Sequence, residues 1–279
     1  AYTADITGMQ SFVSDYKFTK SIMPGTRSTW GWHHSLNPNN YDLKNFPVNE
    51  YNISGRKIRI MEESPDTFCS YLYKSPQRIQ LGFVGMEFTL KNGKTATIDD
   101  IRNIKQYLDL WKGEIISSFS LDGEEVNVIT LCNASRASVS FKIISNLLAQ
   151  KRLKVFIHFP GVDDARNYEK ESWYFKGEFG SGADYDHPEL HKTQSFISEA
   201  NKSFFFERTL DNDQYSATLN FEQSVSLNTD SSKRHLFYFV PETDANHLSL
   251  SVLYSPEVDV KEKSDKLNFI STRKKINKY

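Results

Sequence analysis

Hydrophobic and polar positions alternate with a period of two along most of the chain, which predicts β-strands. The alternation is strongest over residues 78–90, and Asn92-Gly93 then supplies a hairpin turn. Residues 101–111 also carry apolar side chains near helical spacing, but we expect a short turn after Asp100 and an extended segment over residues 105–110. The other predicted strands form two blocks: 114–120, 126–132, 137–144 and 153–159 in the first, and 204–210, 215–221, 224–228, 235–240 and 248–253 in the second.

Within each block the predicted strands are joined by short connections. Such connections leave no room for the helical crossovers of a parallel sheet, so the strands of the first block are expected to pair as an antiparallel meander. We therefore predict an all-β fold, a large antiparallel two-sheet sandwich over residues 1–260. Residues 17–50 and 161–200 are expected to be mostly loops. Leu267, Ile270 and Ile276 fall near helical spacing and predict a short C-terminal helix within residues 261–279.

Composition and charge narrow the class of protein. Hydrophobic residues make up 38% and charged residues 25%, a mix typical of soluble globular domains. The 34 basic and 35 acidic residues give a formal net charge of -1, which argues against a nucleic-acid partner. The sequence has no apolar run near the roughly 20 residues that cross a bilayer, so no membrane insertion is expected. The two cysteines allow one disulfide at most, and Cys132, inside a predicted strand, is expected to be a small buried hydrophobe.

The segment Thr-Trp-Gly-Trp-His-His-Ser at residues 29–35 is the most unusual part of the sequence. An indole offers a flat apolar face and an N–H donor, which suits a pocket wall that stacks on a sugar ring. Histidine side chains add donors and acceptors for hydroxyl groups. The alternative is that these aromatic residues only cap the core beneath a long loop.

Other candidate sites are weaker. An acidic and imidazole cluster at residues 184–191 faintly resembles a calcium loop but lacks its glycine and terminal glutamate, so we interpret it as a solvated loop. His33 and His34 have no further residues nearby that would complete a zinc set. The sequence has no nucleophile elbow, phosphate-binding glycine loop or His-Glu-x-x-His motif. We therefore expect no catalytic nucleophile, no metal and no cofactor, although paired carboxylates for glycoside chemistry cannot be chosen from the 35 acidic residues by sequence alone.

Four segments carry a resemblance to a known family: Tyr-Thr-Ala-Asp-Ile-Thr-Gly-Met-Gln-Ser-Phe at 2–12, Ser-Thr-Trp-Gly-Trp-His-His-Ser at 28–35, Ser-Pro-Gln-Arg-Ile-Gln-Leu-Gly-Phe-Val-Gly at 75–85, and Leu-Asp-Leu-Trp-Lys-Gly-Glu-Ile-Ile-Ser-Ser-Phe-Ser-Leu-Asp-Gly at 108–123. Together, in this order, they resemble the N-terminal β-domain of bacterial six-hairpin glycosidases related to glycoside hydrolase families 65 and 95. The resemblance implies a galactose mutarotase-like super-sandwich over residues 1–260. It also implies that residues 261–279 begin a linker helix to an (α/α)6 barrel outside this chain.

The resemblance also implies a function. In such enzymes the general acid and its partner carboxylate lie on the barrel, so this segment is expected to be the non-catalytic N-terminal domain of a glycoside hydrolase acting on oligo- or polysaccharide, with no activity alone. Its partners are then a carbohydrate and the barrel of the same polypeptide. Sandwich loops help to wall the sugar pocket, and the segment with Trp30, Trp32 and His33, with Arg27 nearby, is the expected substrate-binding element. The parent protein is expected to be exported to the periplasm or beyond, although this chain shows no signal peptide.

Two alternatives stay open. The domain could be a free-standing carbohydrate-binding module, or a mutarotase-type sugar epimerase. The epimerase needs a carboxylate close to His158, His187 or His191, so that an acid and a base flank one anomeric centre. Packing against a barrel predicts instead a sizeable exposed apolar patch on the isolated domain.

Overall fold

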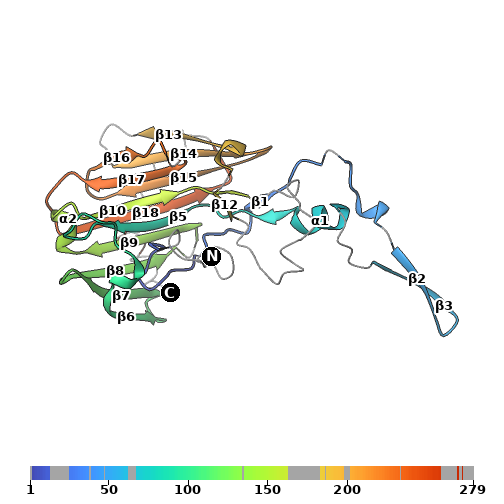
Figure 1. The fold of residues 1–279 in the computed structure, drawn as a ribbon, viewed down its shortest axis with the longest axis horizontal. Coiled ribbons are helices and arrows are strands. Elements are labelled where there is room, and N and C mark those ends of the chain that lie inside the picture. Colours follow the sequence, from blue (N-terminus) through green and yellow to red (C-terminus); the bar gives the residue numbers. More distant parts are fainter. Residues whose placement is uncertain are drawn as a thin grey trace.

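The computed structural model describes residues 2–12, 25–37, 39–46, 48–61, 67–133, 135–162, 183–185, 187–197, 202–232, 234–258, 269 and 272. Within these residues the fold is a sandwich of an eight-stranded and a four-stranded antiparallel sheet, with three two-stranded pairs beside it (Figure 1). The all-β two-sheet prediction is confirmed.

The larger sheet has the strand order β13-β14-β15-β18-β9-β8-β7-β6. The extended segment predicted after Asp100 is its edge strand β6, which follows the short helix η3 (Ile98–Asp100). The bounds of the strands are β6 Arg102–Asp109, β7 Glu114–Leu121, β8 Glu124–Cys132, β9 Ser138–Ile144, β13 His191–Ile197, β14 Ser203–Leu210, β15 Asp213–Phe221 and β18 His247–Ser255.

The smaller sheet has the order β16-β17-β10-β5, with β5 Phe83–Phe88, β10 Leu153–His158, β16 Val225–Thr229 and β17 Leu236–Pro241. This order corrects the predicted meander. After β9 the chain turns through the short helix α2 (Asn146–Ala149), and β10 joins the smaller sheet instead of pairing with β9. Leu147 and Leu148 of α2 are fully buried, so this turn closes one end of the core.

The core lies between the two sheets, where the inward-facing side chains of the central strands pack against one another. Aromatic rings contact one another across the gap: Phe206 lies 4.7 Å from Phe237 and Phe204 lies 5.0 Å from Phe239, measured between ring centroids. Both pairs join β14 of the larger sheet to β17 of the smaller one. The high aromatic content of the sequence is therefore used mainly to fill this layer.

The N-terminal residues protect the open edge of β5. The Gln10 backbone N–H donates to the Val84 carbonyl at 3.1 Å, and the Ser11 hydroxyl accepts from the Met86 N–H at 3.0 Å. Gly85 permits this approach, because a Cβ there would lie 2.7 Å from the Gln10 carbonyl and 2.6 Å from the Phe156 ring. The segment therefore covers the edge of the smaller sheet at β5. An unpaired strand edge would otherwise be open to association with other chains.

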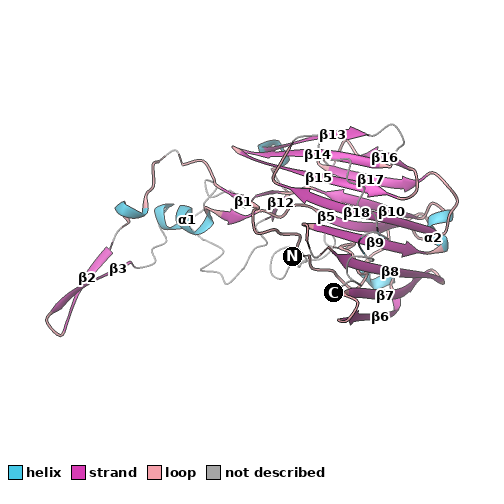
Figure 2. Cartoon of the chain, turned by 180° about the vertical axis from the view of Figure 1, so that it is seen from behind, coloured by secondary structure: helices cyan, strands magenta, loops and turns pink. Residues whose placement is uncertain are grey.

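An arm extends from one end of the sandwich, and we define it as the described residues between 36 and 74 (Figures 1 and 2). It leaves the body after β1 (Trp32–His33) and returns at β4 (Gln77–Arg78), and these two strands pair with each other. Its elements are η2 Leu43–Asn45, β2 Val48–Ile53, β3 Arg56–Met61 and α1 Thr67–Lys74. The loops predicted over residues 17–50 therefore contain short ordered elements and lead into a hairpin.

The structure gives three further outcomes. β11 (Gly161–Val162) and β12 (Ala183–Asp184) form a small pair, and η4 (Pro188–Leu190) precedes β13. Phe269 and Thr272 are helical and buried, as a C-terminal helix requires, and the rest of residues 259–279 lies outside the described part.

Cys132 is exposed at the end of β8, so the expectation of a buried side chain there is wrong, whereas Cys69 is buried in α1. Neither cysteine is in a disulfide.

Candidate functional site

The Trp segment, which we define as residues 26–35, lies where the arm leaves the sandwich. Backbone hydrogen bonds fix it against the strand that leads into β5: the Leu81 N–H donates to the Thr26 carbonyl at 2.9 Å, and the Ile79 N–H donates to the Gly31 carbonyl at 3.0 Å. The segment is thus part of the ordered end of the body, although its sequence is typical of a loop.

Trp32 is the more exposed of the two tryptophans in this segment. Its side chain is 39% exposed, and its indole N–H donates to the Thr29 carbonyl at 3.0 Å. The Arg78 guanidinium lies 4.8 Å from the ring centroid, and Arg78 also donates to the Ser28 carbonyl at 3.2 Å. This cation–π interaction is favourable, and together with the hydrogen bond to Thr29 it fixes the orientation of the Trp32 ring. A fixed and accessible indole can stack on a flat apolar ligand face.

Trp30 and Arg27 lie nearer the interior. Trp30 is partly buried against the core, with its ring 6.4 Å from Tyr215. Arg27 is half-buried, and burial, followed by repulsion from Arg78, lowers the pKa of its guanidinium. The two tryptophans therefore differ. Trp30 packs inward, as the core-capping alternative expects, whereas Trp32 faces solvent, as a pocket wall requires.

His33 is only 1% exposed and points toward the turn between β14 and β15. Its Nδ1 lies 3.1 Å from Asp213 Oδ2, and its Nε2 lies 3.5 Å from Asp211 Oδ2. Asp213 Oδ2 also accepts the backbone N–H of His34 at 2.9 Å. The His34–Asp213 hydrogen bond joins residues 179 positions apart, and together these contacts fasten the Trp segment to the larger sheet. Sugar contact by Arg27, Trp30, Trp32 or His33 stays a prediction.

Next to this turn lies Arg208, a guanidinium with no exposed surface. It donates to the carbonyls of Lys192 at 2.8 Å and Pro160 at 2.9 Å, and to the Thr193 hydroxyl at 2.5 Å. Since guanidinium carries only donors, the 2.9 Å contact of Arg208 with Nδ1 of His191 makes that nitrogen an acceptor. Burial, and then the Arg208 charge, lower the pKa of His191 to about 2, so His191 is neutral in the folded protein.

His191, His187, Asp184, His33 and Asp211 line one small cavity. The expected acid and imidazole cluster thus comes together in part, and His187 Nδ1 lies 2.8 Å from Asp184 Oδ2. The cavity volume is about 10 Å³, which is room for about one water molecule and not for a sugar ring. The arrangement gives no support to an epimerase site.

Within the described residues, no group of three or more His, Cys, Asp and Glu side chains is placed to hold a metal ion. The same part of the chain has no helix that is both long and apolar enough to span a membrane.

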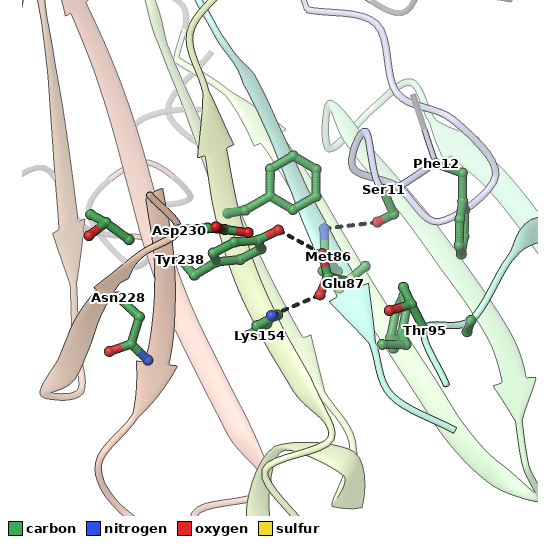
Figure 3. Close-up of a pocket in the computed structure, with 13 residues that line it drawn as sticks. Ser11, Phe12, Met86, Glu87, Thr95, Lys154, Asn228, Asp230 and Tyr238 are labelled. Atoms are coloured by element: carbon green, nitrogen blue, oxygen red, sulfur yellow. Dashed lines mark hydrogen bonds and ion pairs between the residues drawn. The ribbon is translucent and has the colours of Figure 1, made fainter. Parts of the chain in front are cut away.

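A larger pocket of about 490 Å³ opens on the outer face of the smaller sheet (Figure 3). Glu87 of β5 and Lys154 of β10 are paired across the strands, with 2.8 Å between Oε1 and Nζ. The Tyr238 hydroxyl of β17 donates to Glu87 Oε2 at 2.8 Å, and Lys154 Nζ lies 3.9 Å from the Tyr238 ring centroid. Burial and the Glu87 carboxylate raise the pKa of Tyr238, so its phenol stays protonated. Sequence patterning did not indicate this pocket, because its residues come from the N-terminal segment and from strands that are distant from one another in sequence.

Comparison with known proteins assigns no family. No family model matches the chain, and no curated protein matches it. Among solved structures, it is similar to a putative kojibiose phosphorylase from human microbiome, with 11% sequence identity, a TM-score of 0.45 and coverage of 73% of this chain. The match spans 28% of that protein's length. A likeness this distant assigns neither a fold family nor an activity, and the all-β class rests on this chain's own strands.

Proposed function

We propose that this chain is a non-catalytic, carbohydrate-facing β-sandwich domain of an exported glycoside hydrolase, and that the chemistry belongs to an (α/α)6 barrel of the same polypeptide. The observation that carries the proposal is the placement of Trp32, an accessible indole held by Thr29 and Arg78 at the end of the sandwich from which the arm extends. The sequence resemblance to six-hairpin glycosidases gives the same segment this role.

The arm supports the docking part of the proposal. The β2–β3 hairpin exposes Ile53, Ile58 and Ile60 by 52%, 39% and 42%. Register places Ile58 opposite Tyr51 and Ile60 opposite Asn49, so these residues share one face, while Glu50, Lys57 and Arg59 share the other. An isolated two-stranded hairpin with an apolar face is marginally stable in water. A domain packed against this face would lie beyond the same end of the sandwich that carries Trp32 in β1 (Figure 1), which supports the proposal that the two surfaces serve one partner.

A second exposed apolar group lies at the β6–β7 turn, where Leu110 and Trp111 are 80% and 97% exposed. It is on the far edge of the larger sheet, away from the Trp segment (Figure 1). Trp111 therefore offers a matched control for Trp32: both are accessible tryptophans, but only Trp32 lies where the arm begins.

The test uses the protein encoded by the complete gene. Trp32→Ala is expected to raise KM for the saccharide substrate about tenfold with little change in kcat, because stacking binds substrate and transition state alike. Trp111→Ala should leave both constants unchanged. An unaltered KM in Trp32→Ala, or an equal effect of the two substitutions, contradicts the proposed role of the Trp segment.

A further inference from the structure

The pocket that contains Glu87, Lys154 and Tyr238 is separate from the Trp segment. The Trp segment is bonded to residues 79–81, just before β5, whereas the pocket lies against residues 86–88 at the other end of that strand. Its volume of about 490 Å³ falls within the range of pockets that bind small molecules. The pocket therefore has room for a ligand of its own.

The walls of the pocket are fixed by packing on each side. Phe12 stacks on Phe88 with centroids 6.2 Å apart, which holds one wall against the edge of β5. Phe156 packs edge-on against Tyr238 at 6.3 Å, and Gly85 leaves space for the Phe156 ring. The opposite wall is the end of β16 and its turn, where Figure 3 shows Asn228 and Asp230.

The charges of the lining limit what can bind. The lining holds two carboxylates, Glu87 and Asp230, and one ammonium, Lys154, which is already paired with Glu87. The net charge of minus one disfavours an anion. Because Lys154 and Glu87 neutralise each other, the remaining charge is that of Asp230, which is exposed, so solvent screens its attraction for a cation. Donors and acceptors are mixed around the space, with a side-chain amide from Asn228 and a phenol from Tyr238. This combination suits a neutral ligand rich in hydroxyl groups, each of which donates and accepts.

We propose that this pocket is a binding site for a neutral saccharide, distinct from the sugar contact at Trp32. The apolar rings of Phe12 and Phe156 face the C–H surfaces of the sugar, and Glu87, Lys154 and Asn228 hydrogen-bond its hydroxyls. The two carboxylates serve recognition only: with Glu87 already bonded to Lys154 and Tyr238, the pocket binds without cleaving.

The experiment is saturation-transfer NMR on this chain with maltose, cellobiose and myo-inositol as neutral probes, and glucuronate and glucosamine as charged ones. At least one neutral probe is expected to receive saturation more strongly than either charged probe. Asn228→Trp places an indole into the opening from an exposed position and should abolish the signal. Gln194→Trp, an exposed position on the outer face of β13, is the matched control and should retain it.

A second pair of variants tests the polar contacts. Glu87→Gln should weaken binding of the neutral probe tenfold or more, since a hydrogen bond to a charged group is lost. Lys192→Met, an exposed charge on the larger sheet, should not weaken it, and circular dichroism checks that both variants are folded. Absence of binding by all three neutral probes, preference for a charged probe, or binding that survives Asn228→Trp overturns the proposal. Loss of binding in Trp32→Ala with Asn228→Trp unaffected would instead assign the sugar to the Trp segment.

Discussion

The sandwich body and the arm carry the same alternation of apolar and polar residues, but only the body converts it into a core. In the body, inward residues such as Phe206 and Leu250 are at most 1% exposed because a second sheet faces them. In the β2–β3 hairpin, Ile53 and Ile60 alternate just as regularly and stay 52% and 42% exposed. Alternation therefore predicts a strand and its faces, whereas burial depends on what lies opposite. A regular apolar face that stays exposed in this chain is consistent with a surface made for another domain.

Substitution of one apolar residue in each region should give the largest difference. Phe206→Ala is expected to lower the free energy of unfolding by about 3–5 kcal/mol, because it leaves a cavity between the sheets. Ile58→Ala should change it by less than about 0.5 kcal/mol, as is usual at exposed positions. Urea denaturation followed by circular dichroism measures both. Similar losses would show that the hairpin belongs to the cooperative core.

The buried Arg208 and His191 pair should make the body sensitive to acid. The folded state holds His191 neutral, with its pKa lowered to about 2, whereas the unfolded chain takes up a proton near pH 6.5. The unfolded state thus binds more protons below that pH, and stability falls as the pH is lowered. At pH 5 the loss from this group is about 2 kcal/mol relative to pH 6.5.

The measurement is the urea midpoint at both pH values in the native chain and in His191→Gln, whose amide oxygen can still accept from Arg208. The variant should lose about 2 kcal/mol less than the native chain over this interval. An identical pH dependence in both would mean that His191 is protonated in the folded protein.

Replacing the hairpin, residues 48–61, with a short glycine-serine linker tests whether the arm contributes to the stability of the body. We expect a shift in unfolding temperature of only a few degrees, because surface segments of this length contribute little to a separate core. In the protein encoded by the complete gene, the same replacement should increase protease cleavage between the sandwich and the following domain. Unchanged cleavage there would show that the hairpin does not hold that domain.

The smallest expected effect is that of Trp32→Ala on the isolated chain. The indole contributes a cation–π contact with Arg78 at a partly exposed site, so the loss in unfolding free energy should be about 0.5–1 kcal/mol. Thermal unfolding checks this value. A loss of several kcal/mol would make Trp32 a structural residue like its neighbour Trp30.

Much of the body was predictable because its strands carry their pattern locally, including β6, where an apolar spacing near the helical one competed with the correct extended interpretation. The position of β10 was not predictable in the same way. Its alternation is the same whether it pairs with β9 or with β5 and β17, and tertiary packing alone decides between them. The β2–β3 hairpin was not predicted, although Ser54 and Gly55 both have positive φ, 53° and 77°, at a turn that Ser-Gly between alternating runs can signal.

The candidate sites were predictable to the same extent: an unusual local segment could be recognised, but its partners distant in sequence could not. The Trp segment stood out because two tryptophans and two histidines in seven residues are unusual in a loop-like region. Its carboxylate partners, Asp211 and Asp213, lie in a turn nearly 180 positions away, and only the fold brings them to His33. Glu87, Lys154 and Tyr238 each look like an ordinary outward residue of a strand. Their pocket exists because β5, β10 and β17 are neighbours in the smaller sheet.

The most direct test of the central claim compares saccharide cleavage by this chain with cleavage by the protein encoded by the complete gene. Release of reducing ends from oligosaccharides is measured for both at equal molar concentration. The longer protein is expected to cleave, and residues 1–279 alone are expected to release no product. Turnover by the isolated chain, or a gene that encodes no helical-hairpin domain after Tyr279, would contradict the account.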